Sequence, residues 1–347
     1  MPDDEAARKL LGLMTGAWAT QALHTAAELR IADHLRDGAK SASELATLAG
    51  ADRDSLERLL RYLASLGVVH EEDEAFRLGE GGQLLRTDVP GSLHAVALLY
   101  GGLFYESFGA LHHAVRTGER AFDHVFGSRL FDYLAEHPDE ARTFDRAMAA
   151  GSSFFASVPE AVDFSSSEVV VDVGGGVGEL LGRILSAHRH LHGVLIERPH
   201  VLDEARRRLS ALGCLDRCRL VEGDFRQSVP PGGDTYLLAR ILQDWPDEQC
   251  RAILANCRGS MEEGNRLLVI ERPIPSDGAP SLARSWDLHM MANVGGRERT
   301  HDDYRALLAT AGFDLAESRP LPLDMEVLVA RAAPVPRDVT TPASARA

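Results

Sequence analysis

Short apolar runs alternate with helically spaced segments in the second half of the chain. Four such runs occupy residues 168–171, 194–197, 218–222 and 265–271. Runs of this length are typical of strands that are covered on both faces of a parallel sheet. Helical spacing resumes between them, for example over 179–185. The pattern predicts an α/β fold built on a Rossmann-like parallel sheet.

The first hundred residues have a different pattern. Residues 10–35 carry apolar side chains at helical spacing and predict one long helix, and residues 43–50 and 52–66 predict two shorter helices. Residues 68–78 predict a small hairpin whose tip, 71–74, is acidic. Two helices followed by a hairpin predict a winged helix-turn-helix.

These patterns divide the chain into four regions. We assign residues 1–100 to the winged-helix-like domain and 161–333 to the α/β domain. Residues 101–160 predict helices rich in aromatic side chains, which link the two domains and line a substrate pocket. Residues 334–347 are rich in Pro, Ala, Thr and Ser and are predicted to be a disordered tail.

Charge and composition narrow the classes of partner. The chain has 347 residues, of which 45% are hydrophobic, and a formal net charge of −15. Nucleic acids and anionic membranes both attract clustered Lys and Arg, so neither is expected as a partner. The chain starts with acidic residues and has no run of 18 apolar residues, so we expect a cytoplasmic protein with no membrane segment.

A winged helix raises the alternative of a DNA-binding regulator. However, the charges on the helix at 52–66 nearly cancel, and the four acids at 71–74 would repel a phosphate backbone. The predicted helix at 10–35 is richer in apolar residues than the surface of a monomer tolerates. We therefore expect this domain to form a homodimer.

The segment from Val171 to Gly178 carries the clearest signal of function. It reads Val-Asp-Val-Gly-Gly-Gly-Val-Gly and joins a buried strand to a helix, which is the geometry of nucleotide sites. The structural alternative, a plain strand-to-helix turn, needs one glycine rather than four. The residues predicted to contact a cofactor here are Asp172, Gly174, Gly176 and Gly178.

Acidic residues after the next two strands indicate which cofactor is bound. Glu197 ends the second strand at about the spacing expected for a contact with ribose hydroxyls. Asp224 and Phe225 follow the third strand. A dinucleotide has no particular need for this second acid, whereas an adenine is bound well by a carboxylate near its amino group and a ring against its face.

The four cysteines do not indicate a metal site. None of them shows the C-x-x-C spacing of zinc ligands. We interpret Cys214, Cys218, Cys250 and Cys257 as reduced packing residues and expect no metal.

Six motifs in order resemble the small-molecule O-methyltransferases that use S-adenosylmethionine, of the plant caffeate and bacterial polyketide and anthracycline type. The resemblance runs from Gly16 to about Arg331. It implies a class I methyltransferase fold, with a mostly parallel seven-stranded sheet whose last strand is antiparallel, behind a helical winged-helix dimerisation domain. The motifs are residues 172–178, 199–201 after Glu197, 223–225, 244–248, 295–300 and 311–313.

The resemblance also implies how the cofactor is held. The glycine loop would hold the methionine part, Glu197 the ribose, and Asp224 with Phe225 the adenine, with Trp245 on the adenine side. The family usually has Asp at the position of Glu197, and the extra methylene keeps the carboxylate. It usually has Lys at the position of Ala239, so that contact is missing or replaced.

The main departure from the family is Gln243. Relatives have a histidine there that removes the proton from the acceptor hydroxyl, and the resemblance implies that Glu271 and Asp303 are the acids that orient it. A glutamine amide takes no proton near neutral pH. We therefore expect catalysis mainly by positioning an acidic phenol, with Gln243, Glu271 and Asp303 as the catalytic residues.

The acceptor pocket has candidates in two segments. Phe154 and Phe155 are aromatic candidates for its wall, with helix packing as the alternative. In the family a helix at 286–293 lines the pocket. His289 on this helix is also a candidate replacement base, unless it faces outward. The residues of this helix predicted to bind substrate are Asp287, His289, Met290 and Asn293.

Taken together, these features predict methyl transfer from S-adenosylmethionine to a phenolic hydroxyl of an aromatic secondary metabolite. Without the histidine, carbon or nitrogen methylation stays open, as does non-methylating use of the scaffold for decarboxylation or hydroxylation, because the fold does not separate them.

Overall fold

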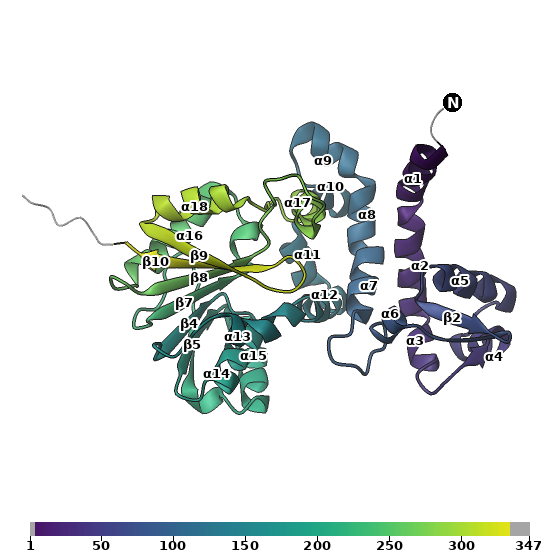
Figure 1. Cartoon of the computed structure of the whole chain (residues 1–347), viewed down its shortest axis with the longest axis horizontal. Helices are drawn as coiled ribbons and strands as arrows, with labels where there is room; N and C mark the ends of the chain where they lie inside the picture. Colours follow the sequence, from purple (N-terminus) through teal and green to yellow (C-terminus); the bar gives the residue numbers. More distant parts are fainter. Residues whose placement is uncertain (1–3, 334–347) are drawn as a thin grey trace, which may run out of the picture. The chain divides into compact units, whose positions relative to one another are not determined.

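A computed structural model describes residues 4–333 and divides the chain into two compact units (Figure 1). One unit contains the residues up to Ser153 together with Ala292–Val294, and the other contains Phe154–Met291 and the residues from Gly295 onward. The finer division predicted at residues 100 and 160 stays a prediction, and the predicted tail lies outside the described residues. No helix among those described is long and apolar enough to cross a membrane.

The N-terminal unit begins with three helices where the apolar pattern predicted one. They are α1 (Asp4–Met14), α2 (Gly16–Glu28) and α3 (Ile31–His34). The chain turns at Thr15 and again at Arg30, which has a left-handed φ of 50°. The expectation of an unbroken helix is therefore wrong, because apolar spacing continues through a break that only the backbone reveals.

The winged helix-turn-helix is present as expected. Ser41 and Asp52 cap α4 (Ala42–Ala49) and α5 (Arg53–Ser65) with side-chain hydrogen bonds to Glu44 N and Ser55 N. Strands β2 (Val69–Glu72) and β3 (Ala75–Leu78) form the hairpin, and β1 (Lys40–Ser41) pairs with β3 in a sheet of order β1-β3-β2. The short α6 (Glu80–Gln83) follows.

Six more helices complete this unit. Phe104 and Phe122 are buried among them, so most aromatic residues of this region serve packing, the alternative that the sequence left open. The helices are α7 (His94–Gly101), α8 (Leu103–Gly109), α9 (Leu111–Thr117), α10 (Ala121–Phe126), α11 (Leu130–Glu136) and α12 (Pro138–Ala150).

The C-terminal unit is built on a seven-stranded sheet of order β6-β5-β4-β7-β8-β10-β9. Strand β10 runs antiparallel to both neighbours and the other pairs are parallel, which confirms the predicted class I methyltransferase fold. The strands are β4 (Val169–Val173), β5 (His192–Glu197), β6 (Cys218–Glu222), β7 (Thr235–Ala239), β8 (Arg266–Glu271), β9 (Phe313–Pro320) and β10 (Glu326–Ala332).

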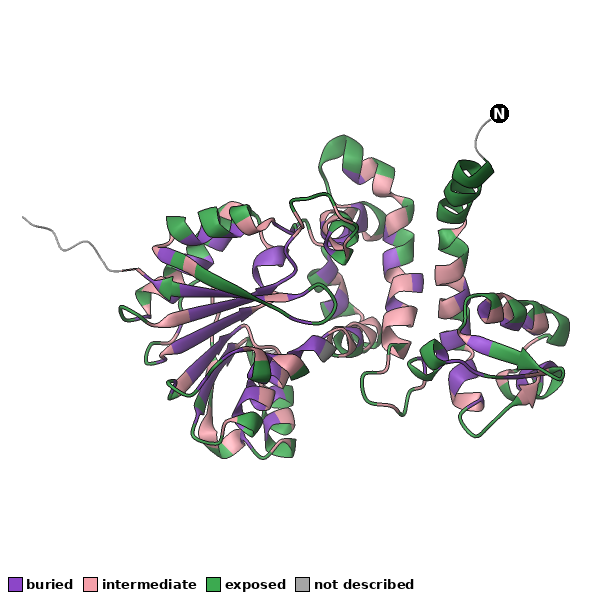
Figure 2. Cartoon of the chain, viewed as in Figure 1, coloured by how far each residue is buried: buried purple, intermediate pink, exposed green. Residues whose placement is uncertain are grey.

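Helices cover both faces of the sheet, so its central strands are buried (Figure 2). Along β4, Val171 and Val173 pack with the residues of α16 (Asp247–Gly259) and α18 (His301–Thr310), whereas Val170 packs with those of α14 (Glu179–Ala187) and α15 (Pro199–Ala211). The remaining elements are η1 (Ser153–Ser157), α13 (Val158–Ala161), η2 (Leu215–Arg217), η3 (Leu242–Asp244) and α17 (Leu282–Asn293).

Parallel pairing brings the carboxyl ends of β4, β5, β6, β7 and β8 to one edge of this sheet. The glycine loop, Glu197, Asp224, Gln243 and Glu271 all lie at or just after these ends. Ligands of open α/β sheets bind at this edge. The topology therefore brings residues that are far apart in the sequence to one candidate site.

Candidate active site

The glycine loop needs its glycines for two separate reasons. Gly174, Gly176 and Gly178 have φ values of 68°, 54° and 76°, which side chains rarely adopt. A Cβ on Gly174 would lie 2.9 Å from the Phe225 ring, so this part of the loop is already packed. A Cβ on Gly176 would meet nothing within 4 Å. The Gly176 side of the loop is therefore open to a ligand.

Asp172 lies beneath this loop. A Cβ on Gly175 would lie 2.3 Å from Asp172 Oδ2, so the loop is packed directly on the carboxyl group. Both carboxyl oxygens are buried and unpaired among the residues that the structure describes. Burial, and secondarily the charge of Glu197, raise the pKa of Asp172 to about 7.

Glu197 and the glycine loop come together as the sequence predicted. The Gly176 N–H donates to Glu197 Oε2 over 3.2 Å, and the Arg198 N–H donates to Glu197 Oε1 over 2.8 Å. The carboxylate is thus held at the open side of the loop. This is where an acid that binds ribose hydroxyls would lie.

Asp224 has a partner that the sequence did not reveal. Arg226 forms an ion pair with it at 2.5 Å, and this pairing lowers the pKa of Asp224. The same guanidinium lies 5.1 Å from the centroid of the Trp245 ring. Arg226 therefore links the two residues that were predicted on the adenine side, and Phe225 packs against the glycine loop beside them.

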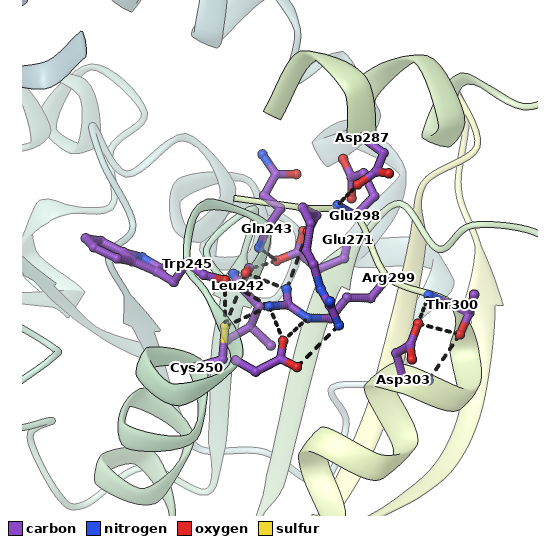
Figure 3. A network of polar contacts seen from close by, with 12 residues as sticks. Leu242, Gln243, Trp245, Cys250, Glu271, Asp287, Glu298, Arg299, Thr300 and Asp303 are labelled. Carbon is purple, nitrogen blue, oxygen red and sulfur yellow. Dashed lines mark hydrogen bonds and ion pairs between the residues drawn. The ribbon is translucent and has the colours of Figure 1, made fainter. Parts of the chain in front are cut away.

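Glu271 holds the turn that carries Gln243 (Figure 3). Its Oε1 accepts from the Leu242 N–H over 2.8 Å and from the Gln243 N–H over 3.4 Å. Its contacts are thus with the backbone of the turn. The buried Oε2 has no partner within the described chain, and burial raises the pKa of Glu271 well above its usual value. Glu271 therefore favours its protonated form.

The Gln243 amide is buried next to Asp244. Burial raises the pKa of Asp244 to about 6, against the lowering effects of Arg240 and of a hydrogen bond from the Gln243 side chain. The backbone carbonyl of Gln243 accepts from the Arg297 N–H over 2.8 Å. Gly296 packs so closely that a Cβ there would lie 1.9 Å from the same carbonyl oxygen. The Gln243 turn is thus fixed from two directions.

The buried side chain of Arg299 donates hydrogen bonds to the same turn. Its Nη1 donates to Leu242 O over 2.7 Å, and its Nη2 donates to Trp245 O and to Asp247 Oδ1, each over 2.8 Å. Sequence reasoning placed Arg299 in a motif but assigned it no task. Its fork of donors shapes the turn from residue 242 to 245.

Asp303 has a different place from the one predicted. Its carboxylate accepts from the Thr300 N–H and hydroxyl over 3.0 and 2.7 Å, forming the capping box at the start of α18. Figure 3 shows Asp303 beside Thr300 and apart from Gln243 and Glu271. Its contacts are those of a helix cap and do not support the predicted role of orienting the catalytic residue.

Glu298, to which the sequence analysis assigned no role, is a further acid at this site and is electrostatically coupled to Glu271 and Asp244. It is 3% exposed, and neither carboxyl oxygen has a hydrogen-bond partner in the described part of the chain. Its N–H donates to Asp287 Oδ1 over 3.0 Å. The only signal in the sequence was its place in the motif at 295–300, because an acid in a loop produces no periodicity.

Three of the four α17 residues that were predicted to bind substrate are buried, and Asp287 is half-buried. His289 does not face outward, and burial together with the charge of Arg240 lowers its pKa to about 4, which makes it a poor proton acceptor. Met290 is buried, and Asn293 accepts a hydrogen bond from Ser107. Phe154 and Phe155 are buried in the core on the α14 face, with ring centroids 4.7 Å apart, as the packing alternative predicted.

All four cysteines are free, and Cys214, Cys250 and Cys257 are buried. Among the described residues no group of three or more His, Cys, Asp or Glu could hold a metal ion.

The fold and this site define a class I methyltransferase. Residues 108–314 match the model of an O-methyltransferase domain, and residues 11–88 match the O-methyltransferase dimerisation domain. The chain therefore belongs to the family of S-adenosylmethionine-dependent O-methyltransferases.

Relatives in this family methylate more than one kind of atom. The 3-amino-4-hydroxybenzoate 4-O-methyltransferase of Streptomyces cremeus is 46% identical over 94% of this chain and 90% of the relative. The phenazine-1-carboxylate N-methyltransferase of Pseudomonas aeruginosa is 35% identical over 94% and 97%, respectively. The S-adenosylhomocysteine-bound structure of CalO1, a methyltransferase in calicheamicin biosynthesis, is 34% identical, with a TM-score of 0.87 over 96% of this chain and 100% of that chain.

Proposed function

We propose that this protein transfers the methyl group of S-adenosylmethionine to a phenolic hydroxyl of an aromatic secondary metabolite. Membership of the O-methyltransferase family and the likeness to 3-amino-4-hydroxybenzoate 4-O-methyltransferase support the proposal. The observation that carries it is the meeting of the open glycine loop and the rigid Gln243 turn at one edge of the sheet.

The chain has groups suited to each part of the cofactor. When bound, S-adenosylmethionine supplies a methyl group on a positively charged sulfur. The open side of Gly176 would receive its methionine part above Asp172, and the carboxylate of Glu197 would bind the ribose hydroxyls. Phe225 and Trp245 would flank the adenine. Both oxygens of Asp224 already accept from Arg226, so a hydrogen bond from the adenine amino group would have to displace one of these contacts.

Gln243 would hold the acceptor without taking its proton. An amide donates and accepts hydrogen bonds but has no basic lone pair at neutral pH. Losing a general base costs a factor of about 10² to 10⁴ in rate. Alignment of oxygen, methyl and sulfur can contribute about 7 to 11 kcal/mol. Positioning would therefore dominate, and acidic phenols would be the best acceptors.

The winged-helix domain would join two copies of the chain. It matches the dimerisation domain of the family. No residue of α1 is buried within one chain, and its leucines are exposed. Burying these side chains against a second copy removes apolar surface from water. We therefore propose a homodimer.

Nitrogen methylation is the second candidate function. The absent histidine favours it, because the lone pair of an aromatic nitrogen attacks a methyl group without prior loss of a proton. The phenazine-1-carboxylate N-methyltransferase among the relatives supports the same alternative.

A panel of phenols, hydroxybenzoates, naphthoates and aromatic nitrogen heterocycles, incubated with methyl-labelled cofactor, separates the two candidates. We expect labelled ethers from the phenols. Label on nitrogen alone would contradict the proposal and favour the second candidate.

Two substitutions test the role of Gln243. Gln243→His should preserve or raise turnover of weakly acidic phenols, because it restores a base. Gln243→Met keeps the length but removes the hydrogen bonds, and the loss of about 1 kcal/mol should lower kcat/KM by about fivefold to tenfold. Calorimetry with S-adenosylhomocysteine checks that the cofactor site is intact. An unchanged Gln243→Met enzyme would contradict a role of the amide in holding the acceptor.

A further inference from the structure

Methylation of a phenol releases one proton, and Gln243 cannot receive it. The oxygen–carbon bond forms as the carbon–sulfur bond breaks, the sulfonium becomes a neutral thioether, and the hydroxyl proton must pass to a base or to solvent. Four carboxyl groups and one histidine in this part of the chain are candidates. Asp244 and Glu271 bond to the Gln243 turn, Asp287 accepts from the Glu298 N–H, and His289 lies on α17.

The two neighbours of Glu298 in the chain hold it against the Gln243 turn. The Arg297 N–H donates to the backbone carbonyl of Gln243 over 2.8 Å, and the guanidinium Nη1 of Arg299 donates to Leu242 O over 2.7 Å. The N–H of Glu298 itself donates to Asp287 Oδ1. Its position is thus set by three hydrogen bonds, none of which uses its carboxyl group.

The carboxyl group of Glu298 is buried and unused. Both oxygens lack a partner among the described residues, although the residue is only 3% exposed. An unpaired buried carboxyl group opposes folding, so a structure that keeps one has a site where a ligand can complete its hydrogen bonds. Its charge acts on Glu271, whose carboxyl group holds the Gln243 turn.

The other groups are less suited to accept the proton. Glu271 uses one oxygen to hold the turn and favours its protonated form. Asp244 already accepts from the Gln243 amide, and the low pKa of His289 makes it a weak base. Asp287 accepts from the Glu298 N–H.

We propose that Glu298 is the proton acceptor of this enzyme: its carboxylate binds the acceptor hydroxyl and takes the proton as the methyl group is transferred. This role rests on the proposed O-methylation. The proton then leaves to solvent when the product departs, which regenerates the carboxylate.

The electrostatic surroundings of Glu298 bring the pKa of its carboxyl group close to neutral pH. Burial, with the nearby Asp287 and Asp244, raises the pKa of Glu298 to about 7, against the opposing effects of Arg272 and Arg240. Glu271 and Tyr304 also lie within its electrostatic reach. A general base works best when its pKa is near the working pH. The group is half ionised near pH 7 and becomes the active carboxylate as the pH rises.

The test compares wild type with Glu298→Gln on two phenols, one weakly acidic and one nitro-substituted and already ionised. We expect kcat/KM for the weak acid to fall by a factor of about 10² to 10⁴, the usual contribution of a general base. The ionised phenol has no proton to lose and should be affected little. Glu317→Gln, an exposed carboxyl group on β9, is the matched control and should change neither rate.

The pH dependence of kcat/KM provides a second readout. Wild-type kcat/KM for the weak acid should rise as the pH passes about 7, and the ionised phenol should not show this rise. The rise should disappear in Glu298→Gln. Calorimetric binding of S-adenosylhomocysteine and the unfolding temperature establish that the variant is folded.

The outcomes separate this role from the proposed function. Methylation of both phenols with an unchanged rate and pH profile in Glu298→Gln would overturn the role of Glu298 and leave O-methylation standing. An equal loss on both phenols would mean that Glu298 only positions the acceptor, which also overturns it. If the wild-type enzyme methylates an aromatic nitrogen but no phenol, the proposed O-methylation is wrong. The role of Glu298 as proton acceptor is then wrong as well, because methylation of such a nitrogen releases no proton.

Discussion

Replacing Arg299 with Met tests whether one buried guanidinium shapes the active-site turn. The side chain is 1% exposed and donates to the carbonyls of Leu242 and Trp245 and to Asp247. Methionine fills much of the same volume but donates no hydrogen bond. The variant therefore removes the donors while changing the packing little.

The contacts of Arg299 determine how much stability the variant should lose. The carbonyls of Leu242 and Trp245 lose their shortest hydrogen bonds and keep only longer contacts with the Cys250 thiol at 3.3 Å and, for Leu242, with the Trp245 N–H at 3.4 Å. A group left unsatisfied costs about 1–3 kcal/mol, so each weakened carbonyl costs at most about that much. The Asp247 side chain is 36% exposed, so losing its ion pair adds at most about 1 kcal/mol. Removing the guanidinium also relieves the desolvation of its charge, which offsets part of the loss. We expect the free energy of unfolding to fall by about 3 kcal/mol.

Urea denaturation at pH 7 measures this change, and Asp247→Asn is the control. Asp247→Asn weakens the ion pairs of this partly exposed carboxylate with Arg299 and Arg297 and should cost about 1 kcal/mol or less. Turnover of a phenol by Arg299→Met should fall more than binding of S-adenosylhomocysteine, because the turn that carries Gln243 loses its anchor. If both variants lose the same small amount of stability, the carbonyl contacts do not hold the turn and the reasoning is refuted.

Two further substitutions probe the same region. Asp303→Ala should lower the free energy of unfolding by about 1 kcal/mol through the lost cap, with kcat/KM unchanged, and a large fall in kcat/KM with normal stability would restore the predicted catalytic role of Asp303. Gly296→Ala places a Cβ 1.9 Å from Gln243 O, so the loop must move and turnover should drop sharply. Gly259→Ala, where a Cβ meets nothing within 4 Å, is its control, and equal activity of the two alanine variants would contradict the close packing at Gly296.

The pattern of the chain predicted the elements that form locally. The apolar runs predicted β4, β5, β6 and β8 within two residues of their observed ends, because a strand covered on both faces needs uninterrupted apolar side chains. The prediction of one helix at 10–35 was wrong because the apolar pattern does not mark the turns. Apolar spacing reports which side of a helix is buried, and it continues unchanged across a turn such as that at Arg30.

The sequence did not predict which acidic residues lie around Gln243. Glu298 lies in the motif at 295–300 and Asp303 lies five positions later, and no spacing rule tells which of them faces Gln243. The pair Thr300 and Asp303 has the spacing of a capping box, which indicates in the sequence that a helix begins after Thr300. The place of Glu298 depends on hydrogen bonds to residues more than fifty positions earlier in the chain.

The sequence by itself determined the class of fold, the cofactor loop with Glu197, the family and the absence of the usual histidine. Each of these depends on residue identity, on local spacing or on motifs in order along the chain. Only the tertiary structure decided that Asp224 pairs with Arg226, that His289 is buried, and that Glu298 rather than Asp303 lies near Gln243. The physical reason is that burial and electrostatic coupling arise between segments that meet only when the sheet and its loops are assembled.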